Sequence, residues 1–520
     1  MLKRISILML CAALCICVFS GCNTKANTEA PAAPISAPAG ETSQAPVELP
    51  VPVAANAAVQ KPKYVFLFIG DGMSHVQINA AQVYMGNNTP GAVDTYGLNF
   101  TGFPVAGIAT THDSTSFCPD SASTATSMAT GVKTHSGVIG MEVDKTTVAK
   151  NISEILQEEG MKIGIISSVT INHATPAAFY AHTPSRNEYY DIALQMANSG
   201  FDYFAGGTIG SHTGSDGSQE SAFDVLTKNG YTVVDTVEAI RGLDSSAGKV
   251  YAVAPTLQDS GAMAYTLDSD PDDISLAEFV EKGIEVLDND NGFFMMCESG
   301  KVDWACHAND ALSAITDVIG FEAAIQKAVD FAALHPDETL IVVTGDHETG
   351  GMAIGYATTG YDTAFSILAE QKMSYVEFDS LISDMKKENE NLKLDDVLPV
   401  IKESFGLVAP GDPDAANLKN EALLLSDYEL DKLKSGFEES MKSGDDRSKG
   451  IEAALLYGGY EPLSVSLTHI INNKAGIGWT SYAHTGTPVP VFSMGAGSEL
   501  FGGSYDNTDI FNKLMEALGL

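Results

Sequence analysis

The chain of 520 residues is poor in positive charge. It has 29 lysine and arginine residues against 67 aspartate and glutamate residues, which gives a formal net charge of −38 at pH 7. So acidic a chain excludes nucleic acid as a binding partner, because phosphate contacts along a nucleic-acid backbone need a basic surface. A small anionic ligand remains compatible with it, since a bound metal ion can reverse the local field.

Cysteine is also scarce, and the seven cysteines are too unevenly placed for a disulfide scaffold. Four of them lie within the first 22 residues, which leaves Cys118, Cys297 and Cys306 further along the chain. An odd number cannot all pair. We expect Cys297 and Cys306 to be buried, unreactive thiols rather than metal ligands, because free cysteine is usually buried.

The apolar run near the N-terminus, residues 5–19, is too short to span a bilayer. It follows two basic residues and ends in Phe-Ser-Gly-Cys at Cys22. Residues 1–22 thus resemble a bacterial lipoprotein signal, in which Cys22 becomes a lipidated N-terminus; an ordinary secretory signal is the alternative. Both predict export. The first also predicts a lipid anchor that holds the protein on the periplasmic or extracellular face of the cell membrane.

Residues 23–62 are rich in proline and alanine and contain seven of the 21 prolines of the chain. Such a segment buries too little apolar surface to fold and favours extended conformations, so we interpret it as a disordered tether. The folded part is then expected to cover residues 63–520.

Within that part, short apolar runs alternate with segments of helical periodicity. The runs are residues 64–69, 162–169, 293–297, 339–344 and 489–494, and helical spacing recurs over 276–287 and 312–329. This alternation predicts a three-layer α/β/α sandwich with a mostly parallel central sheet. Residues from about 360 to 470 differ, with helices expected at 375–387 and 426–441, and are interpreted as a helical insertion.

Several polar residues follow the predicted strands, where ligands of α/β folds bind. Asp71 closes the first run, in a Gly-Asp-Gly sequence that is also a common turn. Ser121 begins a run of small residues that predicts a helix, and a serine at a helix N-terminus can face an anion. The plainer alternative is that Ser121 only caps that helix.

Histidines recur at these strand ends, which is hard to explain by chance. Asp303 and His307 are four residues apart, so they would share one face of a helix. Asp346 and His347 follow another apolar run, and His484 precedes the last one. Nitrogen and oxygen ligands with a majority of carboxylates suit zinc or a similar divalent metal.

Taken in order, these segments resemble the alkaline phosphatase family. The matching motifs are residues 64–74, 119–126 with 130–134, 173–178 leading to Arg186, then Glu298, Asp303 and His307, 344–347, and 484–486. They span almost the whole predicted folded part. Each motif alone is weak, but the ordered set is specific.

The resemblance implies a phosphomonoesterase of broad substrate range that works through a covalent phosphoserine. It implies Ser121 as the nucleophile, Arg186 as the clamp on two phosphate oxygens, and two Zn²⁺ and one Mg²⁺ per subunit. One zinc would be held by Asp303, His307 and His484, the second by Asp71, Asp346 and His347 with the Ser121 hydroxyl, and the magnesium by Asp71, Thr175 and Glu298. Asp120 either orients Arg186 or is simply a helix-terminal acid.

One position bears on the identity of the third ion. His173 stands where some members of the family have aspartate, and imidazole suits zinc more than magnesium, so His173 is a further candidate ligand. Family members commonly form homodimers, and the insertion could build or block that interface. The expected partners are therefore small phosphate monoesters, a membrane through the lipid anchor, and a second copy of the chain.

Three other functions remain open. A phosphodiesterase would share the metal ligands, a lipid-anchored phosphate-binding protein would share the exported, tethered domain, and an inactive homologue would share the fold. Asp120, Ser121 and Arg186 favour a monoesterase over a diesterase. Pure anion binding needs only N–H groups and arginine, so the metal ligands and the serine argue against a binding protein.

Overall fold

The computed structural model describes residues 61–89 and 92–520. The predicted signal at 1–22 lies outside the described residues, and so does nearly all of the predicted tether at 23–62. In the described part of the chain, none of the helices combines the length and the apolar character that crossing a bilayer requires. Export and lipid attachment therefore stay predictions.

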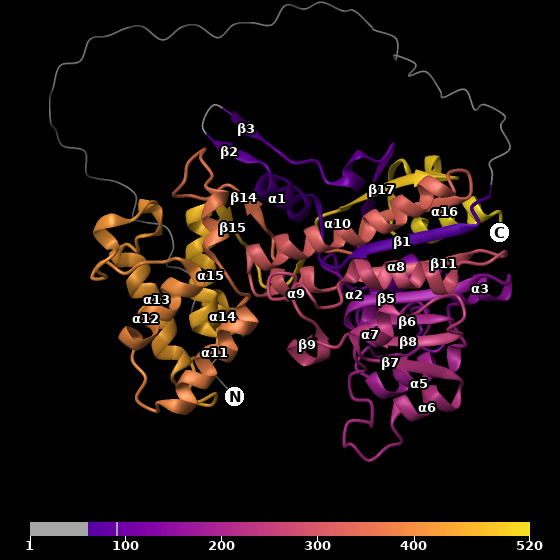
Figure 1. Ribbon diagram of the computed structural model, residues 1–520, viewed down its shortest axis with the longest axis horizontal. Helices are drawn as coiled ribbons and strands as arrows, with labels where there is room; N and C mark the ends of the chain where they lie inside the picture. The colour runs from indigo at the N-terminus through magenta and orange to yellow at the C-terminus, as the bar shows by residue number, and fades with distance from the viewer. Residues whose placement is uncertain (1–60, 90–91) are drawn as a thin grey trace, which may run out of the picture. The chain divides into compact units, whose positions relative to one another are not determined.

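A ten-stranded sheet forms the centre of the described chain (Figure 1). Its strands, in order across the sheet, are β18 (Gly503–Asp506), β4 (Val105–Thr110), β17 (Val489–Gly495), β12 (Thr339–Gly345), β1 (Tyr64–Gly70), β11 (Phe293–Ser299), β5 (Lys162–Thr170), β6 (Tyr203–Gly207), β8 (Lys249–Val253) and β7 (Tyr231–Val234). Only β17 runs antiparallel to its neighbours in this sheet, β4 and β12. The prediction of a mostly parallel sheet is confirmed.

The sheet is buried on both faces, which is why its central strands are continuous apolar runs. Along β1, Tyr64, Phe66 and Phe68 belong to one hydrophobic core, and the alternate residues Val65 and Leu67 belong to the other. Side chains of a strand alternate between the two faces, so each face needs its own layer of helices. The structure is thus a three-layer sandwich, as the sequence predicted.

Two groups of helices form the outer layers. The core on the Tyr64 side includes residues of α1 (His75–Met85), α8 (Leu276–Leu287), α9 (Lys301–His307) and α10 (Ala311–Leu334). The core on the Val65 side includes residues of α2 (Ser121–Thr130), α3 (Ile152–Glu158), α4 (Ala174–Ala177), α5 (Tyr189–Ser199), α6 (Ala222–Lys228) and α16 (Thr508–Leu518). The short helix α7 (Val237–Arg241) contacts α8.

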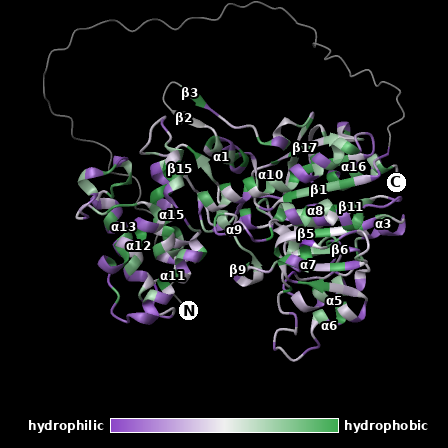
Figure 2. Cartoon of the chain, viewed as in Figure 1, coloured by the Kyte–Doolittle hydropathy of each residue, from purple (hydrophilic) through white to green (hydrophobic). Residues whose placement is uncertain are grey.

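Between β14 (Ala353–Ile354) and β15 (Ile477–Gly478) the chain leaves the sheet and forms a group of helices at the left of Figure 1. These are η3 (Phe365–Glu370), α11 (Tyr375–Glu388), α12 (Leu394–Phe405), α13 (Asp427–Ser440), α14 (Ile451–Tyr457) and α15 (Pro462–Ala475). Because β14 and β15 pair antiparallel, the excursion begins and ends at one place. Figure 2 shows polar and apolar residues intermixed on these helices.

Short strands complete the structure around the ends of the sheet. They are β2 (Asn87–Thr89) with β3 (Ala92–Asp94), β9 (Leu257–Gln258) with β10 (Ala262–Met263), and β13 (Glu348–Thr349) with β16 (His484–Thr485). The β13–β16 pair brings residue 484 next to residue 349, although 135 positions separate them in sequence. A 3₁₀ turn, η2 (Asp259–Gly261), connects β9 to β10.

Candidate active site

The central strands end at one edge and bring three acids together there. Asp71 directly follows β1, Asp346 directly follows β12, and Glu298 lies near the end of β11. The register pairs Gly70 with Gly345 and Ile69 with Glu298, so neighbouring strands end at the same level. All three carboxyl groups are buried. Parallel strands in register therefore create this acidic cluster.

Ser121 is the first residue of α2, and its hydroxyl points at this cluster. The Ser121 Oγ lies 3.2 Å from His347 Nε2 and 3.5 Å from Asp71 Oδ1. The helix cap is Asp120, whose side chain accepts a hydrogen bond from the Ser123 backbone N–H. The alternative that Ser121 only caps the helix is therefore wrong. Its hydroxyl is free to face the acids while the helix N-terminus lies behind it.

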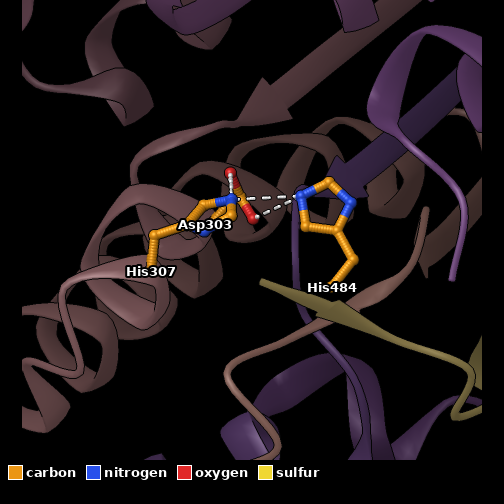
Figure 3. A group of neighbouring side chains, drawn as sticks. All are labelled: Asp303, His307 and His484. Carbon is orange, nitrogen blue, oxygen red and sulfur yellow. Dashed lines mark hydrogen bonds and ion pairs between the residues drawn. The ribbon is translucent and has the colours of Figure 1, made fainter. Parts of the chain in front are cut away.

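One candidate metal group consists of Asp303, His307 and His484, whose side chains converge in Figure 3. His307 Nε2 lies 3.4 Å from Asp303 Oδ2 and 3.1 Å from His484 Nε2. The other ring nitrogens bond to backbone carbonyls, His307 Nδ1 to Tyr482 at 2.6 Å and His484 Nδ1 to Pro119 at 2.5 Å. Such bonds fix the ring so that Nε2 presents its lone pair to the shared point.

A second group lies beside the first and contains His347. His347 Nε2 is 3.3 Å from Asp71 Oδ1 and 3.2 Å from Asp346 Oδ2. The Asp346 Oδ1 accepts the backbone N–H groups of Gly72 and His347, which leaves Oδ2 for the cluster. The ligand atoms that Asp71, Asp303 and His347 offer also lie within 4.8 Å of one another, so Asp303 stands between the two groups.

A third group consists of Asp71, His173 and Glu298. The Thr175 hydroxyl donates to Asp71 Oδ2 at 3.4 Å, which places Thr175 at the same point. Two buried atoms here, His173 Nδ1 and Glu298 Oε1, have no hydrogen-bond partner among the described residues. Buried polar atoms are almost always satisfied in native proteins, so this pair fits a ligand that supplies the missing partner.

Arg186 extends from the loop after α4 to the edge of the cluster. One guanidinium nitrogen donates to Asp120 Oδ2 at 3.0 Å, and the other lies 3.1 Å from His173 Nε2. The same Asp120 oxygen accepts the Gly137 backbone N–H. Asp120 therefore caps α2 and also bonds to Arg186, so the two alternatives given for it do not exclude each other.

The pKa values of the clustered acids diverge in a way that favours a bound cation. Burial first, and neighbouring carboxylates second, raise the pKa of Asp346 to about 8 and place that of Asp71 well above its ordinary value. Burial likewise raises the pKa of Glu298 to about 7. Burial also acts to raise the pKa of Asp303, but His307 and His484 hold it well below its usual range. Buried acids that repel one another are stabilised by positive charge.

A cavity of about 370 Å³ opens beside these groups. Its lining combines predicted site residues with residues that the sequence did not single out. The former are Ser121, His173, Arg186, Asp303, His307 and His484, and the latter are Asp259, Ser260, Tyr375 and Tyr460. Trp304 lines the cavity as well. The cavity is thus shared between the sheet edge and the helical insertion.

Further residues that support the site were missed. Glu348 accepts from Gln77 Nε2 at 2.8 Å and from the Thr485 hydroxyl, which joins α1 to the β13–β16 pair. The Thr349 hydroxyl donates to Asp303 Oδ1 at 2.5 Å and lies 3.2 Å from His347 Nδ1. Neither residue belongs to a pattern of its own in the sequence. The adjacency to His347 is the one signal that could have indicated them.

The cysteine predictions are confirmed where the structure describes them. Cys297 and Cys306 are buried free thiols, and burial raises the pKa of each well above its ordinary value. Neither belongs to any of the three metal groups. Cys118 is a free, exposed thiol.

Comparison with known proteins agrees with this geometry. The family model for alkaline phosphatase matches residues 62–520. Alkaline phosphatase 4 of Bacillus subtilis is 31% identical over 467 residues, which cover 87% of this chain and 88% of that protein. Alkaline phosphatase 3 of the same organism is 29% identical over 476 residues, 88% of this chain and 89% of that one.

Solved structures show the same relationship. A cold-active alkaline phosphatase from Shewanella sp. superposes with a TM-score of 0.70 at 27% identity, over 88% of this chain and 99% of that one. The alkaline phosphatase of the Antarctic bacterium TAB5 gives a TM-score of 0.59 at 25% identity, over 89% of this chain and 99% of that one. Because the family match runs from the first strand of the sheet to the last helix, this chain belongs to the alkaline phosphatase family.

Proposed function

We propose that the chain hydrolyses phosphate monoesters of many alcohols through a covalent phosphoserine on Ser121, at a site for two zinc ions and one magnesium ion. The family accounts for the reaction class. The observation that carries the finer proposal is the position of Ser121, at the start of α2, with its hydroxyl 3.2 Å from His347 Nε2 and open to the cavity. A nucleophilic serine needs this combination of access and neighbouring charge.

The residues present fit three ions. Asp303, His307 and His484 would hold one zinc, and Asp71, Asp346 and His347 the other, as nitrogen and oxygen ligands of zinc. Glu298, Thr175 and Asp71 would hold the third ion, where the unpartnered buried Glu298 Oε1 supports the assignment. Bound ions of this kind lower the pKa of a hydroxyl or water and neutralise charge on the attacking and leaving oxygens.

His173 is the residue that bears on the identity of the third ion. Its unpartnered Nδ1 belongs to the same group as Asp71 and Glu298, whereas its Nε2 faces Arg186. A histidine-to-glutamate variant of the TAB5 enzyme has magnesium bound in its M3 site. Imidazole suits zinc better than magnesium, so zinc is the ion that competes with magnesium for the third position.

The chain itself would bind, orient and carry the phosphoryl group. Arg186 offers a planar pair of N–H donors to two phosphate oxygens, and Asp120 holds that plane in place. The Ser121 oxygen bonds to phosphorus as the ester oxygen leaves with the alcohol, which takes up a proton. A water oxygen then bonds to phosphorus, the Ser121 oxygen leaves and is protonated again, and inorganic phosphate is released.

The test is p-nitrophenyl phosphate hydrolysis from pH 6 to 11 by wild type, Ser121→Ala and Ser127→Ala, each with and without EDTA. Ser127 is the matched control, because it is a buried serine of the same helix whose hydroxyl donates to the Ser123 carbonyl. We expect wild type and Ser127→Ala to be active and to lose activity in EDTA until Zn²⁺ and Mg²⁺ are returned. Ser121→Ala should lose at least about a thousandfold in kcat. Acid quenching should trap a phosphopeptide that contains Ser121.

Three outcomes would contradict the proposal. Ser121→Ala with near-normal kcat would remove the serine from the mechanism. A preference of wild type for bis-p-nitrophenyl phosphate over the monoester would favour a diesterase instead. A folded, metal-loaded protein that binds phosphate and turns over neither ester would favour the binding-protein alternative.

A further inference from the structure

The residues that line the cavity beside Ser121 fall into two chemical groups, which we call its phosphoryl end and its leaving-group end. The phosphoryl end comprises Ser121, Arg186 and the histidines, which suit a phosphoryl group. The leaving-group end comprises residues that our mechanism does not use, namely Asp259, Ser260, Trp304, Tyr375 and Tyr460. A phosphate ester bound at Ser121 must direct its alcohol away from the phosphoryl end. The second end is therefore where the leaving group of a substrate would lie.

Asp259 belongs to the cavity wall, and its side chain is only partly exposed. It and Ser260 both have positive φ angles, 43° and 64°, inside the η2 turn. Behind it lies the buried Lys301, whose Nζ is 3.6 Å from Asp259 Oδ2 and 3.7 Å from the centre of the Tyr265 ring. Lys301 does not line the cavity, whereas Asp259 does. The pair thus presents its negative end to the cavity.

Three aromatic side chains line the same cavity as that carboxylate. Tyr375 and Tyr460 come from the helical insertion, and their rings meet edge to face with centres 6.0 Å apart. The Tyr375 hydroxyl accepts a hydrogen bond from the Tyr265 hydroxyl at 3.4 Å. Burial, and then the charges of Asp303 and Asp259, raise the pKa of Tyr460 above its ordinary value, so Tyr460 stays neutral. Trp304 completes the wall from α9.

The two ends of the cavity differ in the sign of their charged residues. Among the described residues that line it, Arg186 is the one with a permanent positive charge, and it lies at the phosphoryl end against Asp120. The leaving-group end has a carboxylate, aromatic rings and a hydroxyl. Aromatic faces next to a carboxylate attract an ammonium group, whereas the carboxylate repels a second anion.

We propose that Asp259, Tyr460 and Trp304 form a leaving-group subsite that selects phosphate esters of ammonium-bearing alcohols, such as choline and ethanolamine. This inference rests on the proposed monoesterase function and adds a substrate class to it. Phosphate esters whose alcohol carries a carboxylate or a second phosphate are disfavoured at the same subsite.

The test compares two esters of equal shape and different charge. Phosphocholine carries a quaternary nitrogen where 3,3-dimethylbutyl phosphate carries a neutral carbon. For wild type we expect kcat/KM to favour phosphocholine by about tenfold. Asp259→Asn should reduce that ratio to about two, because the charge is lost while the ring contacts stay. Asparagine tolerates positive φ, so the η2 turn is retained in this variant.

Further variants test the contribution of the Tyr460 ring and control for general effects of a substitution on activity. Tyr460→Phe keeps the aromatic face and should keep most of the preference, whereas Tyr460→Leu should lose about half of it or more. Asp290→Asn removes an exposed acid outside the cavity and should leave both kcat/KM values unchanged. A wild-type ratio near one, or an unchanged ratio in Asp259→Asn, would overturn the inference.

A second measurement keeps the inference apart from the proposed function. Hydrolysis of p-nitrophenyl phosphate by the same preparations shows whether the monoesterase function holds. Isothermal titration of metal-loaded Ser121→Ala with the two esters measures affinity without turnover. Tighter binding of phosphocholine, reduced in Ser121→Ala/Asp259→Asn, would support the subsite even if turnover were absent. Equal affinities together with normal p-nitrophenyl phosphate turnover would refute the subsite and leave the proposed function intact.

Discussion

At the scale of single residues, Asp120 connects the N-terminus of α2 to the phosphate clamp. One carboxylate oxygen caps the helix through the Ser123 N–H, and the other accepts from Arg186 and from the Gly137 N–H. Burial acts to raise the pKa of Asp120, but Arg186 and these backbone donors lower it overall. The carboxylate therefore stays ionised and holds the guanidinium plane in one orientation.

Arg186→Lys tests whether that plane matters. Lysine keeps the charge but offers a point donor, so one of the two phosphate contacts is lost. We expect kcat/KM for p-nitrophenyl phosphate to fall by roughly 10- to 100-fold, and the inhibition constant of inorganic phosphate to rise. Arg241→Lys, at an exposed ion pair with Glu278, is the matched control and should change neither value. An unchanged phosphate inhibition constant in Arg186→Lys would remove Arg186 from phosphate binding.

At the scale of elements, the buried acid Asp310 helps to fasten the helical insertion to the sheet. Asp310 caps α10 by accepting from the Ser313 N–H at 3.2 Å. It also accepts from Gln371 Nε2 at 2.9 Å and from the Tyr375 N–H at 3.0 Å. Because Tyr375 lines the cavity, this carboxylate also determines where one wall of the site stands.

Asp310→Ala should therefore destabilise the folded protein. The change leaves several buried donors unpaired, so we expect the free energy of unfolding to fall by about 2–4 kcal/mol. Asp310→Asn keeps one acceptor oxygen, so its free energy of unfolding should fall by less. Asp395→Ala, an exposed acid in the first turn of α12, should cost under about 0.5 kcal/mol. Denaturant unfolding of the metal-loaded protein measures all three, and equal losses in Asp310→Ala and Asp395→Ala would contradict the fastening role.

A second acid makes the α11–α15 contact sensitive to pH. Asp379 accepts from the Ser464 hydroxyl, and burial is the main cause that raises its pKa to about 7. The folded protein thus binds this proton more tightly than the unfolded chain does. The resulting stabilisation is present below about pH 4 and is lost as the pH rises through about 7.

We expect Asp379→Asn to be more stable than wild type at pH 8, with the difference shrinking toward pH 5. Asparagine cannot ionise, so the variant avoids the cost of a buried negative charge at high pH. Asp384→Asn, an exposed acid on the same helix, should follow wild type at both pH values. Melting temperatures at pH 5 and pH 8 decide this, and a constant difference between Asp379→Asn and wild type would contradict it.

At the scale of the whole molecule, several buried acids meet at the carboxyl ends of the central strands. Asp71, Glu298, Asp303 and Asp346 come from separate segments and are all buried. Their mutual repulsion opposes folding unless positive charge lies among them. The proposed metals would thus stabilise the fold as well as the reaction.

Chelation should lower the stability of the protein. We expect EDTA to reduce the melting temperature at pH 8 by about 10 °C or more, because the buried carboxylates are left without a counter-charge. Zn²⁺ and Mg²⁺ should restore it, in wild type and in Ser127→Ala alike. A melting temperature that EDTA leaves unchanged would contradict a metal-filled acidic cluster, independently of any activity.

The sequence by itself determined the elements that carry the chemistry. A continuous apolar run that ends in a polar residue specifies a buried strand with an acid at its end, as β1 does for Asp71 and β12 for Asp346. Spacing of four residues specifies one helix face, as α9 does for Asp303 and His307. These are local relations, because each depends on the geometry of one strand or one helix.

Only the tertiary structure decided which segments meet. An apolar run has no direction in its composition, so the antiparallel course of β17 came from the pairing of whole strands. Glu348, Asp259 and Tyr460 belong to no pattern in the sequence, yet packing brings Glu348 under the metal groups and the other two into the cavity. Contacts between residues far apart in sequence depend on how the cores of sheet and insertion join, and that is a property of the assembled fold.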